Sequence, residues 1–454
     1  MNIIIVGGGK VGITLTKKLS EEGHDVTVID NDPQAISNVT DSMDVITVEG
    51  NGASMEILKM AGADKMDLLI AVTPQDELNI YCCIVAKKLG ITQTIARVRN
   101  PEYSAQFGLM HNELGISMAV NPERSAALEI SRLLRFPGAI KTESFAKGHA
   151  ELLEVKIKED TPLCGTALKD IYTKHNVRML VCAVQDGENV TIPSGDYILK
   201  AGDKINLTAS PRQFSHLFKL LRLSQKLTKK VMIVGGGTLG FYLAQMISEA
   251  GMSVTIVEKN RDKCLHLSEM LPKAVVIEGD GTDRDLLLEE GIEDMDAFVS
   301  LTGLDEENII LAIFARAHGV EKVIAKTNRY SYDEVFEVAG ISAAITPKNT
   351  VSNQIVRYVR AMQNSFASNS VQTLHKIVNE KAEALEFIIS EPQDFLDVPL
   401  KDLRFKKNLL LGCIVRKGKF IIPGGNDSIQ LGDSVVVISR SRQMINDFMD
   451  ILVR

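Results

Sequence analysis

Two glycine-rich segments of this sequence carry the residue types and spacing that bind phosphate. The first, GGGKVG at 7–12, is a GxGxxG pattern that directly follows the β-branched run 3–6. In such a pattern the first glycine permits a tight turn, the second lets the backbone approach a pyrophosphate, and the third lets the following helix pack against the strand. The phosphate then lies on unpaired N–H groups at the helix N-terminus. We therefore expect a nucleotide to contact Gly7, Gly9, Lys10, Val11 and Gly12.

A carboxylate completes this fingerprint. Asp30 stands at the end of the second predicted strand, 25–30. At that position a carboxylate accepts hydrogen bonds from both hydroxyls of an adenosine ribose, and it would repel a 2′-phosphate. The sequence therefore predicts NAD(H) as the ligand, with ATP or ADP as the alternative, in preference to NADP.

The same fingerprint occurs a second time. Its residues are Gly235, Gly237, Gly240 and Glu258. A single GxGxxG is a weak indication because glycines recur at turns, but here strand, glycines, helix and acid are in register twice. The sequence predicts either two nucleotide sites or one site and a structural relic in the second half. Lys10 of the first loop corresponds to neutral Thr238, so the two sites need not share a ligand.

Further polar residues follow the other predicted strands, at the carboxyl edge where ligands of parallel sheets bind. They are Asn51 and Asp280 after the third strand, Thr73 and Thr302 after the fourth, and Arg97 and Lys326 at the end of the fifth. An oxygen after the third strand can accept from the adenine amine or can close an Asx turn. The two cations can reach nucleotide phosphates or can form surface ion pairs.

Catalytic and metal-binding patterns are missing from the sequence. The eight histidines form no triad and no HExxH, and the six cysteines lack CxxC spacing. A dehydrogenase should also offer a second domain that presents an acid or base near the nicotinamide, but the smaller units, at about 139–224 and 367–454, carry few such candidates. We therefore predict no enzyme, no catalytic residue and no metal, with an NAD-dependent oxidoreductase as the alternative.

The chain is an internal duplication. Residues 2–30 align with 230–258, and the motif IPSG at 192–195 recurs as IPGG at 422–425. In each half a large unit alternates β-branched runs with helical patterns, and a small unit with alternating strands follows it. This predicts an α/β fold with two Rossmann-like doubly wound parallel sheets, each followed by a small α+β module. The predicted domains are 1–136, 139–224, 229–362 and 367–454.

A helix with one apolar face ends each large unit, at 122–136 and at 347–362. The spacing of the apolar residues predicts that this face is buried. The face could pack on the sheet of its own unit, or the helix could cross to a partner unit. Periodicity alone does not choose between these arrangements.

Composition restricts the classes of function. The chain has 454 residues, of which 45% are hydrophobic and 24% charged, as in an ordinary globular protein. The net charge of -7 offers no overall attraction to nucleic acid. No apolar stretch is long enough to span a bilayer, no secretory signal is visible, and the sparse cysteines suit a reducing cytosol. We expect a cytoplasmic protein without a nucleic-acid partner.

Together these features resemble the TrkA family, the cytosolic subunits of Trk potassium uptake systems, which consist of two RCK (regulator of potassium conductance) units in tandem. The order of the modules carries the resemblance, together with five segments and their second-half partners. These segments are IIIVGGGKVG at 3–12, VID at 28–30, EGNGAS at 49–54, AVTPQDELN at 71–79 and ARVRNPEY at 96–103.

The resemblance implies a regulatory, gating subunit and no enzyme. It implies a homotetrameric ring, peripheral on the cytoplasmic face of the plasma membrane, that docks on a membrane-embedded TrkH/TrkG-like subunit and controls potassium transport as NAD(H) or ATP/ADP occupancy changes. The glycines, Asp30, Asn51 and Arg97 would contact the ligand, and the helices 122–136 and 347–362 would cross between units. A freestanding adenine-nucleotide sensor is a further alternative.

Overall fold

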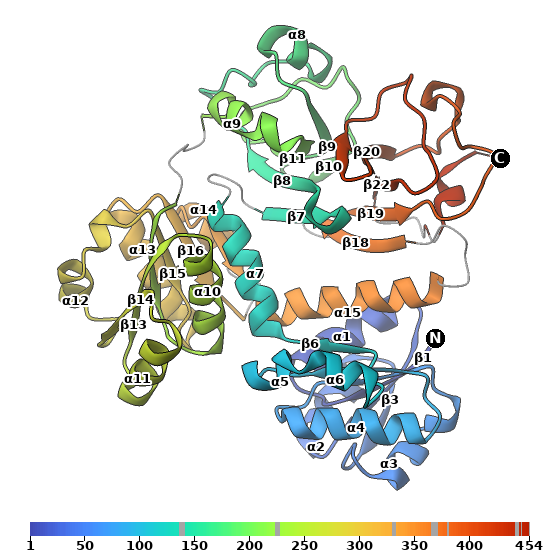
Figure 1. Ribbon diagram of the computed structural model, residues 1–454, viewed down its shortest axis with the longest axis vertical. Coiled ribbons are helices and arrows are strands. Elements are labelled where there is room, and N and C mark those ends of the chain that lie inside the picture. Colours follow the sequence, from blue (N-terminus) through green and yellow to red (C-terminus); the bar gives the residue numbers. More distant parts are fainter. Residues whose placement is uncertain are drawn as a thin grey trace.

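The computed structural model describes residues 1–135, 141–222, 228–328, 333–364, 371–378, 381–440, 445 and 447–453. These residues form two six-stranded and two five-stranded sheets, which alternate along the chain (Figure 1). The predicted fold class and the internal repeat are thereby confirmed. The predicted domain ends at 136, 139, 224, 367 and 454 fall outside the described residues.

The first large unit is a parallel sheet whose strand order reverses beside its central strand. The order is β3 (Ile46–Glu49), β2 (Asp25–Asp30), β1 (Asn2–Val6), β4 (Leu68–Ala71), β5 (Gln93–Arg97) and β6 (Met118–Val120). Its connecting helices are α1 (Lys10–Glu21), α2 (Pro33–Ser42), α3 (Met55–Met60), α4 (Asp76–Lys88), α5 (Pro101–Ala105) and α6 (Phe107–Asn112). Because β2 and β4 flank β1 on opposite sides, their following loops diverge and leave a crevice at the carboxyl end of β1.

The second large unit repeats this topology. Its order is β14 (Ala274–Glu278), β13 (Ser253–Glu258), β12 (Lys230–Val234), β15 (Ala297–Ser300), β16 (Lys322–Lys326) and β17 (Ala343–Ile345). Its connecting helices are α10 (Thr238–Glu249), α11 (Arg261–Met270), α12 (Arg284–Glu289), α13 (Asp305–Ala317) and α14 (Asp333–Val338). The equivalent crevice therefore lies at the carboxyl end of β12.

The last helix of each large unit packs on the other large unit. In α7 (Pro122–Arg135), the buried Ile130 shares a core with Leu243 of α10 in the second half. In α15 (Pro347–Asn364), the buried Ile355 shares a core with Leu15 of α1 in the first half. Figure 1 shows α7 beside α10 and α15 beside α1. Each half thus completes the hydrophobic core of the other, which settles the alternative that periodicity left open.

The two small modules are antiparallel sheets. The first has the order β10 (Asn189–Thr191), β9 (Met179–Asp186), β11 (Lys204–Ala209), β8 (Ala150–Lys156) and β7 (Lys141–Phe145), with helices α8 (Ile171–His175) and α9 (Pro211–Leu220). The second has the order β18 (Val371–Ile377), β19 (Ala382–Ile388), β22 (Ser434–Arg440), β20 (Leu409–Arg416) and β21 (Lys419–Ile421). Cys182 of the first and Cys413 of the second belong to one shared core, so the modules pack on each other.

A nearly buried ion-pair cluster joins α15 to a large unit and to a small module. The Arg360 guanidinium lies 2.7 Å from a carboxylate oxygen of Glu22, directly after α1, and 3.5 Å from one of Glu383 on β19. Side chains of Glu22 and Glu383 are 12% and 8% exposed. Because a charge left unpaired at such depth is costly, the cluster fixes α15 against both elements.

No helix in the described ranges is long and apolar enough to cross a membrane.

A buried lysine makes the stability of the second large unit depend on pH. Lys322 begins β16, and burial lowers the pKa of its ammonium to about 8. Between that value and the unfolded-state pKa of about 10.4, the unfolded chain binds more protons, so the free energy of unfolding rises with pH. We expect Lys322→Gln, which installs the residue type of Gln93 in the first half, to remove about 3 kcal/mol of this rise between pH 7 and pH 10.5.

Urea unfolding of wild type and Lys322→Gln across this pH range measures the difference. Lys230→Gln is the matched control, because Lys230 begins β12 and is exposed. Its pH dependence should follow that of the wild type. Parallel curves for wild type and Lys322→Gln would contradict the assignment of the rise to Lys322.

Candidate functional site

The two glycine-rich loops face one cleft between the large units. This cleft has a volume of about 1070 Å³ and is lined by residues of both halves. From the first half, the predicted site residues that line it are Gly7, Gly9, Lys10, Val11, Asp30, Thr73 and Arg97; from the second half, they are Gly235, Gly237, Gly240, Glu258, Asp280, Thr302 and Lys326. Gly12 and Asn51 do not line it. The two predicted sites are therefore two sides of one space.

The geometry of each glycine in the first loop matches a distinct role. Gly7 has φ +109°, a left-handed conformation that side chains rarely adopt. A Cβ on Gly12 would lie 1.8 Å from the Gly7 carbonyl oxygen, so the third glycine permits the close packing of α1 on the turn. A Cβ on Gly9 would meet nothing within 4 Å, because this residue faces open space. The middle of the loop is thus accessible to a ligand.

The second loop repeats this arrangement. Gly235 has φ +108°, and a Cβ on Gly240 would lie 2.2 Å from the Gly235 carbonyl oxygen. Gly237 again has open space around it. Both loops therefore present free backbone N–H groups at a helix start, at α1 and at α10, which is an arrangement that binds phosphate.

Backbone N–H groups hold the two fingerprint carboxylates in place. Asp30 Oδ2 accepts from the Gly8 N–H at 2.5 Å, and Oδ1 accepts from the Asp32 N–H at 2.9 Å. Glu258 accepts from the corresponding Gly236 and Asn260 N–H groups at 2.8 and 2.9 Å. A carboxylate can accept about four hydrogen bonds, so each retains capacity for ribose hydroxyls.

Two asparagines, one in each half, connect the strand ends of the site by hydrogen bonds, and neither was among the predicted site residues. Asn79 is fully buried; its Oδ1 accepts from the Thr73 N–H and hydroxyl, both at 2.8 Å, and its Nδ2 donates to the Arg97 carbonyl at 2.9 Å. Asn308 Oδ1 accepts from the Thr302 N–H at 2.7 Å, and its Nδ2 donates to the Lys326 carbonyl at 3.0 Å. The only sequence signal was the recurrence of this asparagine in both halves. These contacts position the backbone of the predicted site residues.

The residues after the third strands form Asx turns. Asn51 Oδ1 accepts from the Ala53 N–H at 2.9 Å, and Asp280 Oδ1 accepts from the Thr282 N–H at 2.9 Å. Because Asn51 does not line the cleft, its observed contact is the turn. A contact of either side chain with adenine stays a prediction.

Cations from both halves gather at the middle of the cleft. Burial lowers the pKa of the Lys326 ammonium, and Lys10 of the first half lowers it further, against the opposing effect of two carboxylates. Burial and Lys10 also lower the pKa of Lys348, at the start of α15. A bound phosphate would relieve this repulsion, since it brings negative charge to three lysines.

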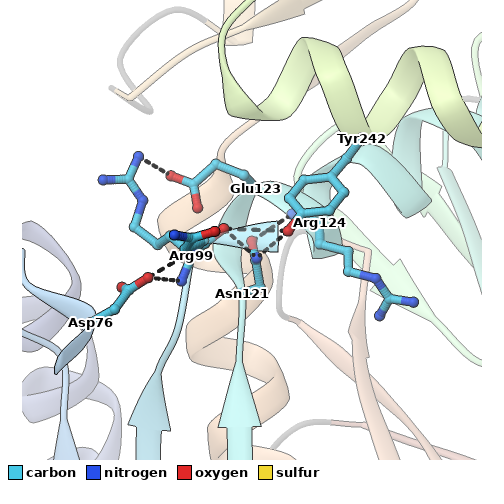
Figure 2. A network of polar contacts seen from close by, with 7 residues as sticks. Asp76, Arg99, Asn121, Glu123, Arg124 and Tyr242 are labelled. Carbon is cyan, nitrogen blue, oxygen red and sulfur yellow. Dashed lines mark hydrogen bonds and ion pairs between the residues drawn. The ribbon is translucent and has the colours of Figure 1, made fainter. Parts of the chain in front are cut away.

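Arg99 and Glu123 belong to this cleft and were not among the predicted site residues (Figure 2). The Arg99 guanidinium lies 2.7 Å from a carboxylate oxygen of Glu123, which stands in the first turn of α7. The backbone N–H groups of Arg99 and Asn100 donate to Asp76 Oδ2 at 2.8 and 2.7 Å. The sequence signal for Arg99 was a difference between the halves, since the second half has Asn328 at this place.

Unsatisfied polar atoms show where a ligand would bind. Among the described side chains, the buried Nε atoms of Arg97 and Arg99 have no hydrogen-bond partner, and neither has Oε2 of Glu123. Since buried donors normally find acceptors, phosphate oxygens in the cleft would complete the two arginine Nε groups, whereas Glu123 Oε2 needs a donor such as a ribose hydroxyl. The residues present therefore fit an adenine nucleotide. No three His, Cys, Asp or Glu side chains of the described part are placed to hold a metal ion.

Comparisons with known proteins agree with this architecture. The sequence matches the TrkA-N domain family over 3–122 and 231–347, and the TrkA-C domain family over 152–222 and 384–452. It is 34% identical to the Trk system potassium uptake protein TrkA homolog 1 of Methanosarcina mazei, covering 97% of both chains. It is 33% identical to the Trk system potassium uptake protein TrkA of Halomonas elongata, covering 98% of this chain and 97% of that protein.

A solved structure shows the same fold. The GsuK channel bound to NAD superimposes with a TM-score of 0.63 at 18% identity, over 97% of this chain and 77% of that one. At this identity the likeness concerns the fold alone. The full-length relatives and the two matches to each domain family show that this chain belongs to the TrkA family, with a TrkA-N and a TrkA-C domain in each half.

Proposed function

We propose that this chain is the nucleotide-binding regulatory subunit of a Trk-type potassium uptake system and that it is not an enzyme. The observation that carries the proposal is the shared cleft, in which the phosphate loops of both halves face each other while each half holds the last helix of the other. A ligand in this cleft contacts both halves. Its occupancy can therefore bias their relative position, as a sensor requires.

The ligand that these residues fit best is NAD(H), with ATP or ADP as the alternative. Asp30 and Glu258, each held by a loop N–H group, would accept from ribose hydroxyls and would repel a 2′-phosphate. The loop N–H groups, Lys10, Arg97 and Lys326 supply the positive charge for phosphates. In addition, a channel of similar fold has been solved with NAD bound.

Regulation then follows from differential affinity. A nucleotide shifts the equilibrium between two shapes of the chain only by binding one shape more tightly, typically by about 1 to 3 kcal/mol for each coupled site. Several chains in one ring would add these contributions. We place such a ring, of four chains, on the cytoplasmic face of a membrane-embedded TrkH/TrkG-like subunit. The names of the full-length relatives, which are potassium uptake proteins, support this partner.

Copurification tests the partner. The tagged chain is recovered from gently solubilised membranes in low salt, with NADH, NAD⁺, ATP or ADP present in turn. We expect a multi-pass potassium transport protein to be retained with some of these nucleotides and released with others. A chain that remains free of any membrane partner under all four conditions would favour the freestanding sensor.

The ribose carboxylates should control affinity. We expect Asp30→Ala to weaken NADH binding at the first site about tenfold to a hundredfold, because it removes hydrogen bonds to a charged acceptor. Glu258→Ala should do the same at the second site. Isothermal titration calorimetry measures both.

Glu49→Ala is the matched control, since Glu49 is an exposed carboxylate at the end of the neighbouring strand β3 and does not line the cleft. Its affinity should equal that of the wild type. Unchanged affinity in both Asp30→Ala and Glu258→Ala would remove the nucleotide assignment. Steady oxidation of NADH with any substrate would instead support an oxidoreductase.

A further inference from the structure

One hydroxyl group of the second half contacts the backbone of the first half beside the cleft (Figure 2). Tyr242, on α10, donates its hydroxyl hydrogen to the Arg99 carbonyl at 3.3 Å. Asn121 closes a triangle, because its Nδ2 donates to the same carbonyl at 3.0 Å and to the Tyr242 hydroxyl at 3.1 Å. Residues of three elements, α10, the segment after β5 and the start of α7, are thereby joined.

The triangle is buried and rigid. Tyr242 is 5% and Asn121 8% exposed. The Tyr242 ring contacts the edge of Phe241 at a centroid distance of 5.6 Å and packs in the core shared with α7. Asn121 Oδ1 accepts from the Arg124 N–H at 2.9 Å, which fixes the side chain at the start of α7. Few alternative rotamers are available, so a shift of α10 moves the Arg99 backbone with it.

The two segments that this link joins, the start of α10 and the segment that carries Arg99, both line the cleft. Tyr242 lies one turn beyond Thr238, where α10 begins and where phosphates of a second-site nucleotide would meet free N–H groups. At the other end, the Arg99 side chain lines the cleft and pairs with Glu123. The link therefore connects the phosphate helix of the second site to a cation of the first.

The reverse link does not exist between the corresponding residues. Thr14 takes the place of Tyr242 on α1, and its hydroxyl donates to the Lys10 carbonyl of its own helix at 2.8 Å. Asn328 takes the place of Arg99, and its side chain is held by Asp305 at 3.1 Å. The connection through Tyr242 thus has no counterpart from α1 to the segment after β16 between the corresponding residues.

We propose that Tyr242 is a positioning residue that couples the two nucleotide sites. A nucleotide on the second loop fixes α10, and the triangle transmits this to the segment that carries Arg99, so the first site becomes ordered for its own ligand. This proposal rests on the proposed function, because it needs a ligand at the second loop. Because a coupling free energy is reciprocal, a ligand at the first site strengthens binding at the second site by the same factor.

Hydrogen exchange measured by mass spectrometry tests the coupling between the second loop and the first-half segment that carries Arg99. The full-length chain carries Asp30→Ala, which weakens the first site, and NADH is added at a concentration that fills the second site only. ADP is the probe in a parallel series. We expect NADH to slow exchange in two peptides, the second loop at 235–241 and the first-half segment at 98–102. The slowing at 98–102 should be lost in the double variant Asp30→Ala/Tyr242→Phe, which keeps the aromatic ring but removes the hydroxyl.

Thr14→Val, combined with Asp30→Ala, is the matched control, since it removes the hydroxyl at the corresponding position of α1. It should retain the slowing at 98–102. Protection at 235–241 without protection at 98–102 would overturn the coupling and leave the proposed function intact. Equal protection of 98–102 with and without the Tyr242 hydroxyl would have the same consequence. No protection at 235–241 with either probe would overturn the second nucleotide site, and the coupling with it.

Discussion

Gly12→Ala should destabilise the first large unit by about 3 kcal/mol and abolish nucleotide binding there, whereas Gly9→Ala should abolish binding alone. The added Cβ of Gly12→Ala would lie 1.8 Å from the Gly7 carbonyl oxygen, so the turn or α1 has to move. The obstacle is backbone and cannot rotate away. Overpacking of this kind typically costs about 1 to 3 kcal/mol.

Gly9 provides the matched control within the same motif. It has φ -74° and ψ -169°, which alanine adopts, and its Cβ would meet nothing within 4 Å. Alanine at this N-cap should cost less than about 1 kcal/mol. It would still occupy the space through which a pyrophosphate approaches the backbone. Urea unfolding and NADH calorimetry separate the two effects; equal stabilities, or normal NADH binding by Gly9→Ala, would contradict the roles assigned to these glycines.

Ile130→Ala should loosen the second large unit, although Ile130 belongs to the first half of the sequence. Ile130 is fully buried in the core formed by α7 and α10. Ile355, at the corresponding place on α15, is fully buried against α1 of the first large unit. Removing such a side chain typically costs about 2 to 5 kcal/mol. Ile355→Ala should accordingly loosen the first large unit.

Hydrogen exchange locates these effects. Faster exchange is expected in β12 and α10 for Ile130→Ala, and in β1 and α1 for Ile355→Ala. Leu128→Ala is the control on α7, because Leu128 is 37% exposed, and it should change neither region. If each substitution instead accelerates exchange in the large unit of its own half of the sequence, α7 and α15 do not pack on the opposite large units in solution.

The parallel sheets, the glycine loops and their carboxylates could be predicted from the sequence because each depends on local patterns. Alternation of strands and helices fixes a doubly wound sheet, and a strand followed by GxGxxG fixes a phosphate loop. The acid at a strand end is equally local. The residues Gly7, Asp30, Gly235 and Glu258 therefore lie where they were expected, along the cleft.

Periodicity could not predict the partner of the last helices, because it shows that a face is buried but not what buries it; only the family resemblance implied that these helices cross between units. The single shared cleft depends on the same exchange of helices and was missed with it. Arg99, Glu123 and Tyr242 come together only when α7 and α10 pack side by side. Asn51 Oδ1 accepts from the Ala53 N–H at 2.9 Å, and its contact with a ligand stays a prediction.

Rubidium flux into liposomes is the most direct test of the central claim, that nucleotide occupancy of this chain regulates potassium transport. The liposomes contain the membrane-embedded transport subunit that copurifies with the chain, and the chain and nucleotides are added on its cytoplasmic side. We predict that NADH, NAD⁺, ATP or ADP changes the flux with the wild-type chain and has no effect with a chain carrying Gly9→Ala and Gly237→Ala. A flux that is the same with and without every nucleotide, while the wild-type chain binds both nucleotide and transporter, would contradict the claim.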